Sequence, residues 1–241
     1  MDQNQIKKHS ILESIILHLA PGILIEGGYF LLRGTVQYFG YPTIFALVLA
    51  VIFILIPVEI GYLLLQGKKR SGRLTLNGMI SYRRSIPFWQ SIIWILIVFV
   101  LTGVIFTLLK PVERILQEHV FSWVPSMNNG LDGNYSSTTL IVTYVLFFVF
   151  IACLGPLVEE FYFRGYLLPR MKGKYAWLLH SFLFAVYHIF TPWMIVSRTV
   201  GLLPLIYAVK KKNIYIGIAV HIMVNSIDVV IGVAFIVKML S

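Results

Sequence analysis

The sequence predicts an all-α, polytopic membrane protein with about seven transmembrane helices (six to eight). Of its 241 residues, 58% are hydrophobic and only 12% are charged. Soluble domains usually carry about twice this share of charge, so a soluble globule of this length would lack polar residues to cover its surface. One transmembrane helix needs roughly 20 apolar residues. Seven spans with short loops therefore account for the length of the chain, and we expect a single membrane domain over residues 1–241.

Apolar runs bounded by charged residues, Gly or Pro mark the expected spans. We place them at residues 11–32, 43–66, 88–109, 138–164, 175–190, 194–209 and 214–240. The fifth and sixth are short and the last is long, so the expected number ranges from six to eight. The first is long and contains Glu13 and Glu26, so we expect a retained span and not a cleaved signal peptide. Asn128 to Ser137 is the turn-rich segment.

The positive charges predict the orientation of the chain. If the N-terminus and every second loop share one side, fifteen of the 20 Lys and Arg residues lie there. The other side has only Arg33, Lys110, Arg114, Arg198 and Lys238. By the positive-inside rule, the N-terminus is cytoplasmic, while the turn-rich segment and the C-terminus face outward. We expect an integral protein of a bacterial plasma membrane. The net charge of +10 then indicates contact with the lipid bilayer and not with nucleic acid.

Ionisable residues inside the expected fourth span suggest a functional site. Such residues are costly in a membrane and mark functional sites by default. The span ends in Gly155-Pro-Leu-Val-Glu-Glu-Phe-Tyr-Phe-Arg-Gly165. Glu160 and Arg164 are four residues apart with the acid first, which favours a helical ion pair. Glu159 lies on another side of the helix and is left free for chemistry. In the alternative interpretation both glutamates only form ion pairs at the membrane surface.

Two later spans each contribute a pair of residues at helical spacing. The fifth contains Phe184 and His188, and the last contains His221 and Asn225. With a rise of 1.5 Å per residue, the polar residues of the three spans lie roughly 12–21 Å from the basic loops. This shared depth predicts one polar site, although a lone histidine in such a helix commonly serves only as an interhelical hydrogen bonder. We expect an aqueous cavity that reaches this site from the side of the basic loops.

The three motifs EExxxR, FxxxH and HxxxN occur here in order, on the fourth, fifth and seventh expected spans. With them, residues 138–241 resemble the CAAX-protease and bacteriocin-processing family of intramembrane proteases, which includes the CAAX prenyl endopeptidases. The resemblance implies a catalytic core over residues 138–241. It also implies that Glu159 is the general base, that His188 helps to hold the water, and that His221 and Asn225 donate to the oxyanion. Glu160, Arg164 and Phe184 would support them.

The reaction that follows from these roles is hydrolysis of a peptide bond by activated water, because no Ser or Cys shares the constellation. We expect no cofactor. The same residues could instead bind zinc through Glu159, His188 and His221, although the chain has no HExxH. The substrate would be a membrane-associated protein or peptide, either prenylated or of bacteriocin type.

The alternative function is non-catalytic: a membrane binding or immunity protein, or a transporter, that uses the same polar site. No internal repeat supports a transporter, and the sequence indicates no particular oligomeric state. His180 and Asp228 could extend the polar site, but we expect packing roles for both. Glu26, Glu59 and His18 lie outside the motifs and are also interpreted as helix-end or packing groups.

Overall fold

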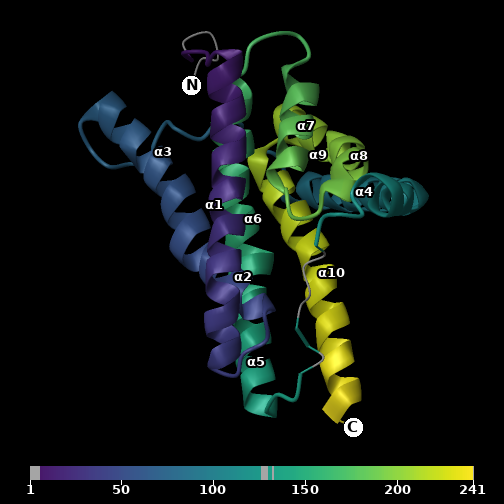
Figure 1. The fold of residues 1–241 in the computed structure, drawn as a ribbon. Helices are drawn as coiled ribbons and strands as arrows, with labels where there is room; N and C mark the ends of the chain where they lie inside the picture. The colour runs from purple at the N-terminus through teal and green to yellow at the C-terminus, as the bar shows by residue number, and fades with distance from the viewer. Residues whose placement is uncertain (1–5, 126–129, 132, 241) are drawn as a thin grey trace.

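The protein consists of packed helices, as predicted. The computed structural model describes residues 6–125, 130–131 and 133–240, and its regular secondary structure in these ranges is helical. Within these ranges, six helices are long and apolar enough to cross a membrane, and a further apolar helix, Ala176–Tyr187, is shorter. The chain is therefore a multi-pass membrane protein (Figure 1). The turn-rich segment at 128–137 lies partly outside the described residues.

The six long helices include stretches of π-helix, with hydrogen bonds five residues apart. The label η marks the π-helices η2 to η5 and also the two short 3-10 helices η6 and η7. The elements are α1 (Ile11–Tyr38), α2 (Ile44–Ala50), η2 (Val51–Leu55), α3 (Ile56–Ser71), α4 (Phe88–Ile115), η3 (Leu116–Val120), α5 (Ser137–Leu146), η4 (Phe147–Leu154), α6 (Gly155–Glu159), η5 (Glu160–Leu167), η6 (Leu168–Arg170), α7 (Ala176–Tyr187), η7 (Pro192–Met194), α8 (Ile195–Gly201), α9 (Leu203–Lys211) and α10 (Ile214–Leu240). Most spans extend beyond the expected ends, and the third continues to Val120.

The fifth expected span is shorter than its apolar run. Helix α7 has 12 residues, which is about 18 Å at 1.5 Å per residue. This is too short to cross a hydrocarbon core of about 30 Å alone. The helix ends because His188 leaves the helical region, with φ −84° and ψ 57°. The 3-10 turn η7 then starts at Pro192, so the apolar residues after Tyr187 do not continue the helix.

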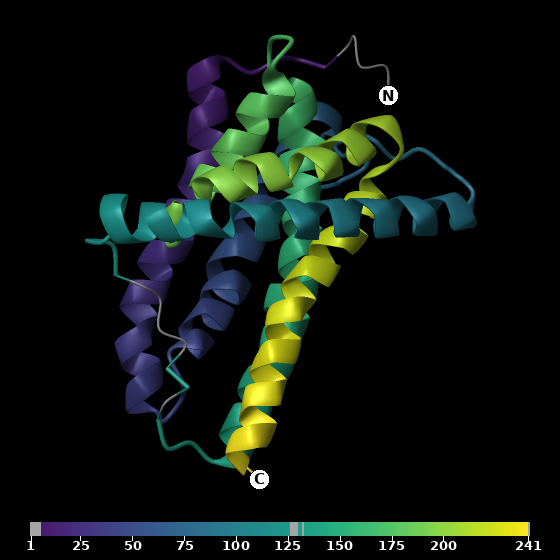
Figure 2. The same ribbon diagram turned by 90° about the vertical axis from the view of Figure 1, so that its right-hand side faces the viewer.

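Two orientations of helices are visible in the bundle. In Figures 1 and 2, α1, α2, α5, α6 and α10 run roughly in one direction, whereas α4 crosses them. Helices α8 and α9 lie between α7 and α4, and both pack against α4. The C-terminal part of α10 reaches the end of the bundle opposite to the start of α1 (Figure 1). The three elements that carry the motifs meet in the half near the start of α1.

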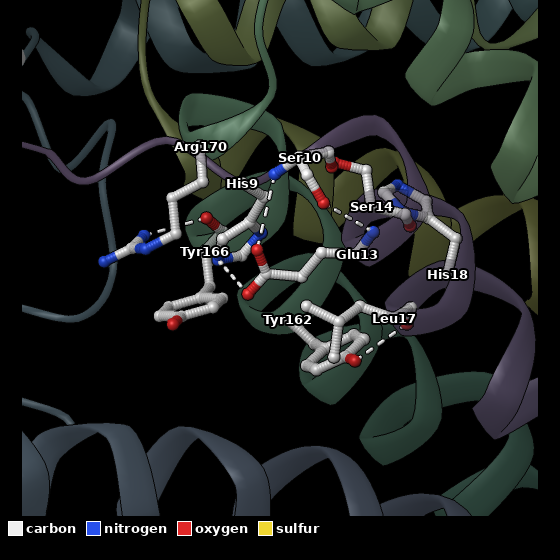
Figure 3. A network of polar contacts seen from close by, with 9 residues as sticks. All are labelled: His9, Ser10, Glu13, Ser14, Leu17, His18, Tyr162, Tyr166 and Arg170. Carbon is white, nitrogen blue, oxygen red and sulfur yellow. Dashed lines mark hydrogen bonds and ion pairs between the residues drawn. The ribbon is translucent and has the colours of Figure 1, made fainter.

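The start of α1 is attached to the end of the fourth span (Figure 3). The Ser10 hydroxyl accepts a hydrogen bond from the Glu13 amide, and the Glu13 carboxylate accepts one from the Ser10 amide, forming a capping box. The His9 amide donates to the Arg170 carbonyl at 2.9 Å, and Lys8 donates to the Pro169 carbonyl at 2.7 Å. The start of α1 and the loop after Arg170 therefore lie on one side.

The other basic loops gather at the same end. The Ser81 amide donates to the Gly165 carbonyl, and the Ile214 amide donates to the Tyr82 carbonyl. Arg84 donates to the Lys211 carbonyl at 3.4 Å. The grouping of these loops agrees with the pattern behind the predicted orientation, while the compartment that they face stays a prediction.

Candidate active site

The two adjacent glutamates lie where the fourth span changes its hydrogen-bonding pattern. Helix α6 ends at Glu159 and the π-helix η5 begins at Glu160. Both side chains are buried, with 7% and 0% of their surfaces exposed. Short π-helical stretches occur frequently at functional sites, and here one extends from Glu160 past Arg164.

Glu160 has the partner that the spacing predicted. Its carboxylate lies 3.2 Å from an Arg164 nitrogen, and both side chains are completely buried. The guanidinium carbon of Arg164 also lies 3.7 Å from the centre of the Phe184 ring. This cation–π contact connects the fourth span to α7 and explains the place of Phe184 in its motif.

His221 of α10 faces both glutamates. Its Nδ1 lies 3.1 Å from a Glu160 oxygen, and its Nε2 lies 3.6 Å from a Glu159 oxygen. Gly217, one turn earlier, permits this close packing, because a Cβ there would lie 2.8 Å from Glu160 Oε2 and 2.6 Å from a Val209 methyl carbon. The 3.1 Å contact between His221 Nδ1 and Glu160 is a hydrogen bond, whereas the 3.6 Å distance between His221 Nε2 and Glu159 is too long for one.

A residue that the sequence analysis did not single out holds Glu159. The Tyr187 hydroxyl donates a hydrogen bond to Glu159 Oε1 at 2.9 Å, and Tyr187 is 2% exposed. Gly22 of α1 packs directly on this residue, because a Cβ at Gly22 would lie 2.2 Å from the Tyr187 carbonyl oxygen. The available signal in the sequence was the position of Tyr187, next to the motif residue His188.

His188 lies at the end of α7, where the chain leaves the helix. Its Nδ1 is 3.0 Å from the Phe184 carbonyl oxygen. Because a carbonyl only accepts, Nδ1 donates, and in a neutral ring Nε2 carries the lone pair. The Phe184 ring centre is 4.9 Å from that of His188 and 6.1 Å from that of His221, so Phe184 contacts both imidazoles.

Asn225 contacts the backbone of the fourth span. Its Nδ2 donates to the Ile151 carbonyl at 3.2 Å. This carbonyl lacks its usual helical donors: the Gly155 amide bonds to the Phe150 carbonyl, and Pro156, five residues after Ile151, has no N–H. One amide hydrogen of Asn225 therefore satisfies a carbonyl that the π-helix leaves open, and the other is not used in this bond.

The remaining candidates lie in separate surroundings. His180 pairs with His18, with 2.9 Å between Nδ1 of His180 and Nε2 of His18. Nδ1 of His18 lies 2.6 Å from the Ser14 carbonyl oxygen (Figure 3), so the pair connects α1 to α7. Asp228 is exposed, and its charge interacts with that of Arg198.

Glu59 of α3 is the second residue that the sequence analysis did not place at the site. It is 0% exposed, and neither carboxylate oxygen has a hydrogen bond to any described residue. Its electrostatic neighbours include Glu159, Arg164 and Tyr187. Glu59 belongs to none of the three motifs. Only the general cost of placing a carboxylate in a membrane could have indicated from the sequence that it lies at the site.

The described side chains do not fit a zinc site. No group of three His, Cys, Asp or Glu side chains among the described residues is arranged to hold a metal ion. A zinc-bound histidine needs one free ring nitrogen. Both imidazoles meet this condition at Nε2, because Nδ1 of His188 donates to the Phe184 carbonyl and Nδ1 of His221 donates to Glu160. Glu159, His188 and His221 therefore fail as a ligand set because of the spacing of their side chains in this arrangement, and not because of the state of their rings.

A cavity of about 360 Å³ lies at the end where the basic loops gather. Its lining consists of Arg83, Arg84, Ser85, Ile86, Phe88, Ser91, Asn213 and Tyr215. None of these is a motif residue. The cavity is basic, but its lining does not include the glutamates of the site, so the expected aqueous route to them stays a prediction.

Residues 141–227 match the Rce1-like family of type II CAAX prenyl endopeptidases. This segment belongs to that family. It contains all three motifs, and it lies within the part of the chain that was expected to be the catalytic core. No curated protein and no solved structure matches the chain. The Rce1-like family is a family of proteases, and such a family acts on protein substrates. The match does not reach Glu59, which belongs to the N-terminal half.

Proposed function

We propose that this Rce1-like protein is an intramembrane endopeptidase that hydrolyses a peptide bond of a membrane-associated protein or peptide, with water as the nucleophile. The observation that carries the proposal is the pair of buried glutamates bridged by His221, inside the segment that matches the endopeptidase family. Peptide hydrolysis needs a base that takes a proton from water and donors that stabilise the tetrahedral oxyanion.

Glu159 is the proposed base. Tyr187 holds its Oε1 at 2.9 Å, which fixes the carboxylate and leaves the lone pairs of Oε2 available to a water molecule. The water oxygen bonds to the substrate carbonyl carbon while Glu159 takes the proton. Glu159 then returns this proton to the leaving nitrogen as the C–N bond breaks. Each proton removed from water is thus accounted for without a second acid.

His221 is proposed to accept a hydrogen bond from Glu159 once Glu159 has taken the proton from water. Its Nδ1 donates to Glu160 at 3.1 Å, and Glu160 is paired with Arg164, so the imidazole has a fixed orientation. In the neutral ring, Nε2 presents its lone pair toward Glu159. The sequence-based role of His221 as an oxyanion donor therefore requires Nε2 to gain a proton first.

His188 and Asn225 are proposed to contact the water and the oxyanion. The bond from Nδ1 of His188 to the Phe184 carbonyl sets the tautomer in which Nε2 accepts a hydrogen bond, which suits a water molecule. Asn225 keeps one amide hydrogen beyond its bond to Ile151, and this hydrogen can stabilise an oxyanion.

The test is a cleavage assay with protein purified in detergent. The substrates are a farnesylated peptide with a C-terminal CAAX sequence and the same peptide without the farnesyl group, with products identified by mass spectrometry. In parallel, new N-termini are mapped in membranes that contain the wild type or Glu159→Gln. We expect cleavage that depends on Glu159 and that Glu118→Gln, an exposed carboxylate, leaves unchanged. No Glu159-dependent product in either experiment would contradict the proposal.

A further inference from the structure

Glu59 lies in a region where a carboxylate is hard to accommodate. Its side chain is fully buried, and neither oxygen has a hydrogen bond to the described part of the chain. Burying an ionised carboxylate without a partner costs far more than burying a neutral carboxylic acid. The protonation of Glu59 therefore depends on the charges that face it.

Those charges come from the fourth span and from α7. The ionisable neighbours of Glu59 are Glu159, Tyr162, Arg164 and Tyr187. Arg164 is the positive one, but it is already paired with Glu160 at 3.2 Å and stacked on Phe184. Glu159 is a second carboxylate, and two neighbouring carboxylates disfavour double ionisation. The neutral acid is the form of Glu59 that suits this position.

Tyr187 can connect the two carboxyl groups. A tyrosine hydroxyl has one hydrogen to donate and lone pairs to accept. The hydrogen is used, because Tyr187 donates to Glu159 at 2.9 Å. Toward Glu59, the same oxygen can then act only as an acceptor. A carboxylate cannot supply the donor, whereas a protonated carboxyl group can.

We propose that Glu59 is a protonated positioning residue: it has no hydrogen bond to any described residue in this structure, and in the working site it donates its hydrogen to the oxygen of Tyr187 so that Tyr187 donates to Glu159. This inference rests on the proposed role of Glu159 as the base. The order Glu59, Tyr187, Glu159 fixes the direction of both hydrogen bonds. By this proposal, helix α3 of the N-terminal half contributes a residue to a site whose three motifs lie within residues 141–227.

The protonation state is tested without an activity assay. Infrared spectra of wild type and Glu59→Gln are compared in detergent, because the carbonyl stretch of a protonated acid is separate from the carboxylate bands. We expect Glu59→Gln to remove one protonated-acid band that Glu118→Gln leaves in place. The absence of such a difference would overturn the proposal. This readout decides the question even if no substrate is cleaved, so its failure is distinguishable from failure of the proposed function.

The positioning role is tested by kinetics. Glutamine is neutral and can donate an N–H to Tyr187, so Glu59→Gln should retain a kcat close to that of the wild type. Glu59→Leu has no donor and should lower kcat roughly tenfold, about the value of one hydrogen bond. KM should not change, because Glu59 is not proposed to contact substrate.

A double variant separates this role from a general loss of packing. Since Glu59 acts through Tyr187, Glu59→Leu should have no further effect on kcat in a Tyr187→Phe background. Independent effects of the two substitutions, or a Glu59→Leu variant with the kcat of the wild type, would overturn the proposal. If Glu59→Leu does not fold, the infrared comparison of Glu59→Gln remains the deciding measurement.

Discussion

Glu160 and Arg164 form an ion pair of 3.2 Å in which neither side chain is exposed. The pair lies directly beside Glu159, the proposed base. Its position explains why the two adjacent glutamates, though identical in chemistry, have different surroundings: one is bound to a guanidinium and the other to a tyrosine hydroxyl.

The first prediction is that Glu160→Gln destabilises the protein. Removing one partner of a buried ion pair typically costs 3–5 kcal/mol, roughly, because the other charge stays buried without compensation. Thermal unfolding in detergent, compared with the exposed control Glu118→Gln, measures the effect. Equal unfolding temperatures of the two variants would show that the pair contributes little to stability.

The second prediction concerns the close contact of α1 with α7. Gly22→Ala would place a Cβ 2.2 Å from the Tyr187 carbonyl oxygen, so α1 must move away from the residue that holds Glu159. We expect lower stability and lower kcat. Gly27→Ala in the same helix has no atom within 4 Å of the added Cβ. It should be neutral, or stabilising by about 0.5–1 kcal/mol from helix propensity. An equal loss in both variants would argue against the close contact as the cause.

The third prediction tests the origin of the bond between Asn225 and Ile151. Asn225→Ala leaves the Ile151 carbonyl without its donor, at a cost of about 1–3 kcal/mol. Pro156→Ala supplies an N–H on the fourth span, so in that background Asn225→Ala should cost less. A double-mutant cycle on unfolding free energies measures the coupling. Strictly additive effects would mean that Pro156 is not the reason why Asn225 is needed.

The fourth prediction concerns orientation. Single cysteines are introduced at Lys172, Lys211 and Ser136 in a Cys153→Ala background and treated in intact cells with an impermeant thiol reagent. The charge asymmetry predicts labelling at Ser136 only. Labelling at Lys172 and Lys211, with Ser136 protected, would place the basic loops and the adjoining end of the site on the outer face.

The spans could be predicted from the sequence because a lipid environment requires continuous apolar runs of a set length. The end of α7 could not be predicted in this way. The residues after Tyr187 are still apolar, so hydropathy continues through a point at which the backbone turns at His188. Likewise, the π-helix η4 ends where the Gly155 amide bonds to the Phe150 carbonyl and where Pro156 has no N–H, and composition does not record this bonding.

The candidate site could be predicted in part. Motif spacing indicated Glu160 with Arg164, and the shared depth of the three motifs indicated one site. The contacts of Tyr187 and Glu59 could not be predicted because they are tertiary contacts. Glu59 lies far from Glu159 in the chain, and its neighbours depend on how α3 packs against the fourth span. The two partners of His221 also could not be seen from periodicity, which gives the face of a helix but not the atoms it meets.

The most direct test of the account is the single-turnover cleavage rate of Glu159→Gln, measured on any substrate that the wild type hydrolyses. Glutamine keeps the size of the side chain and its bond to Tyr187 but cannot take a proton from water. Thermal unfolding is measured on the same samples, to confirm that the variant is folded. The account predicts a folded protein whose cleavage rate falls about a hundredfold to ten-thousandfold, the usual contribution of a general base. A folded Glu159→Gln protein that cleaves at the wild-type rate would contradict it.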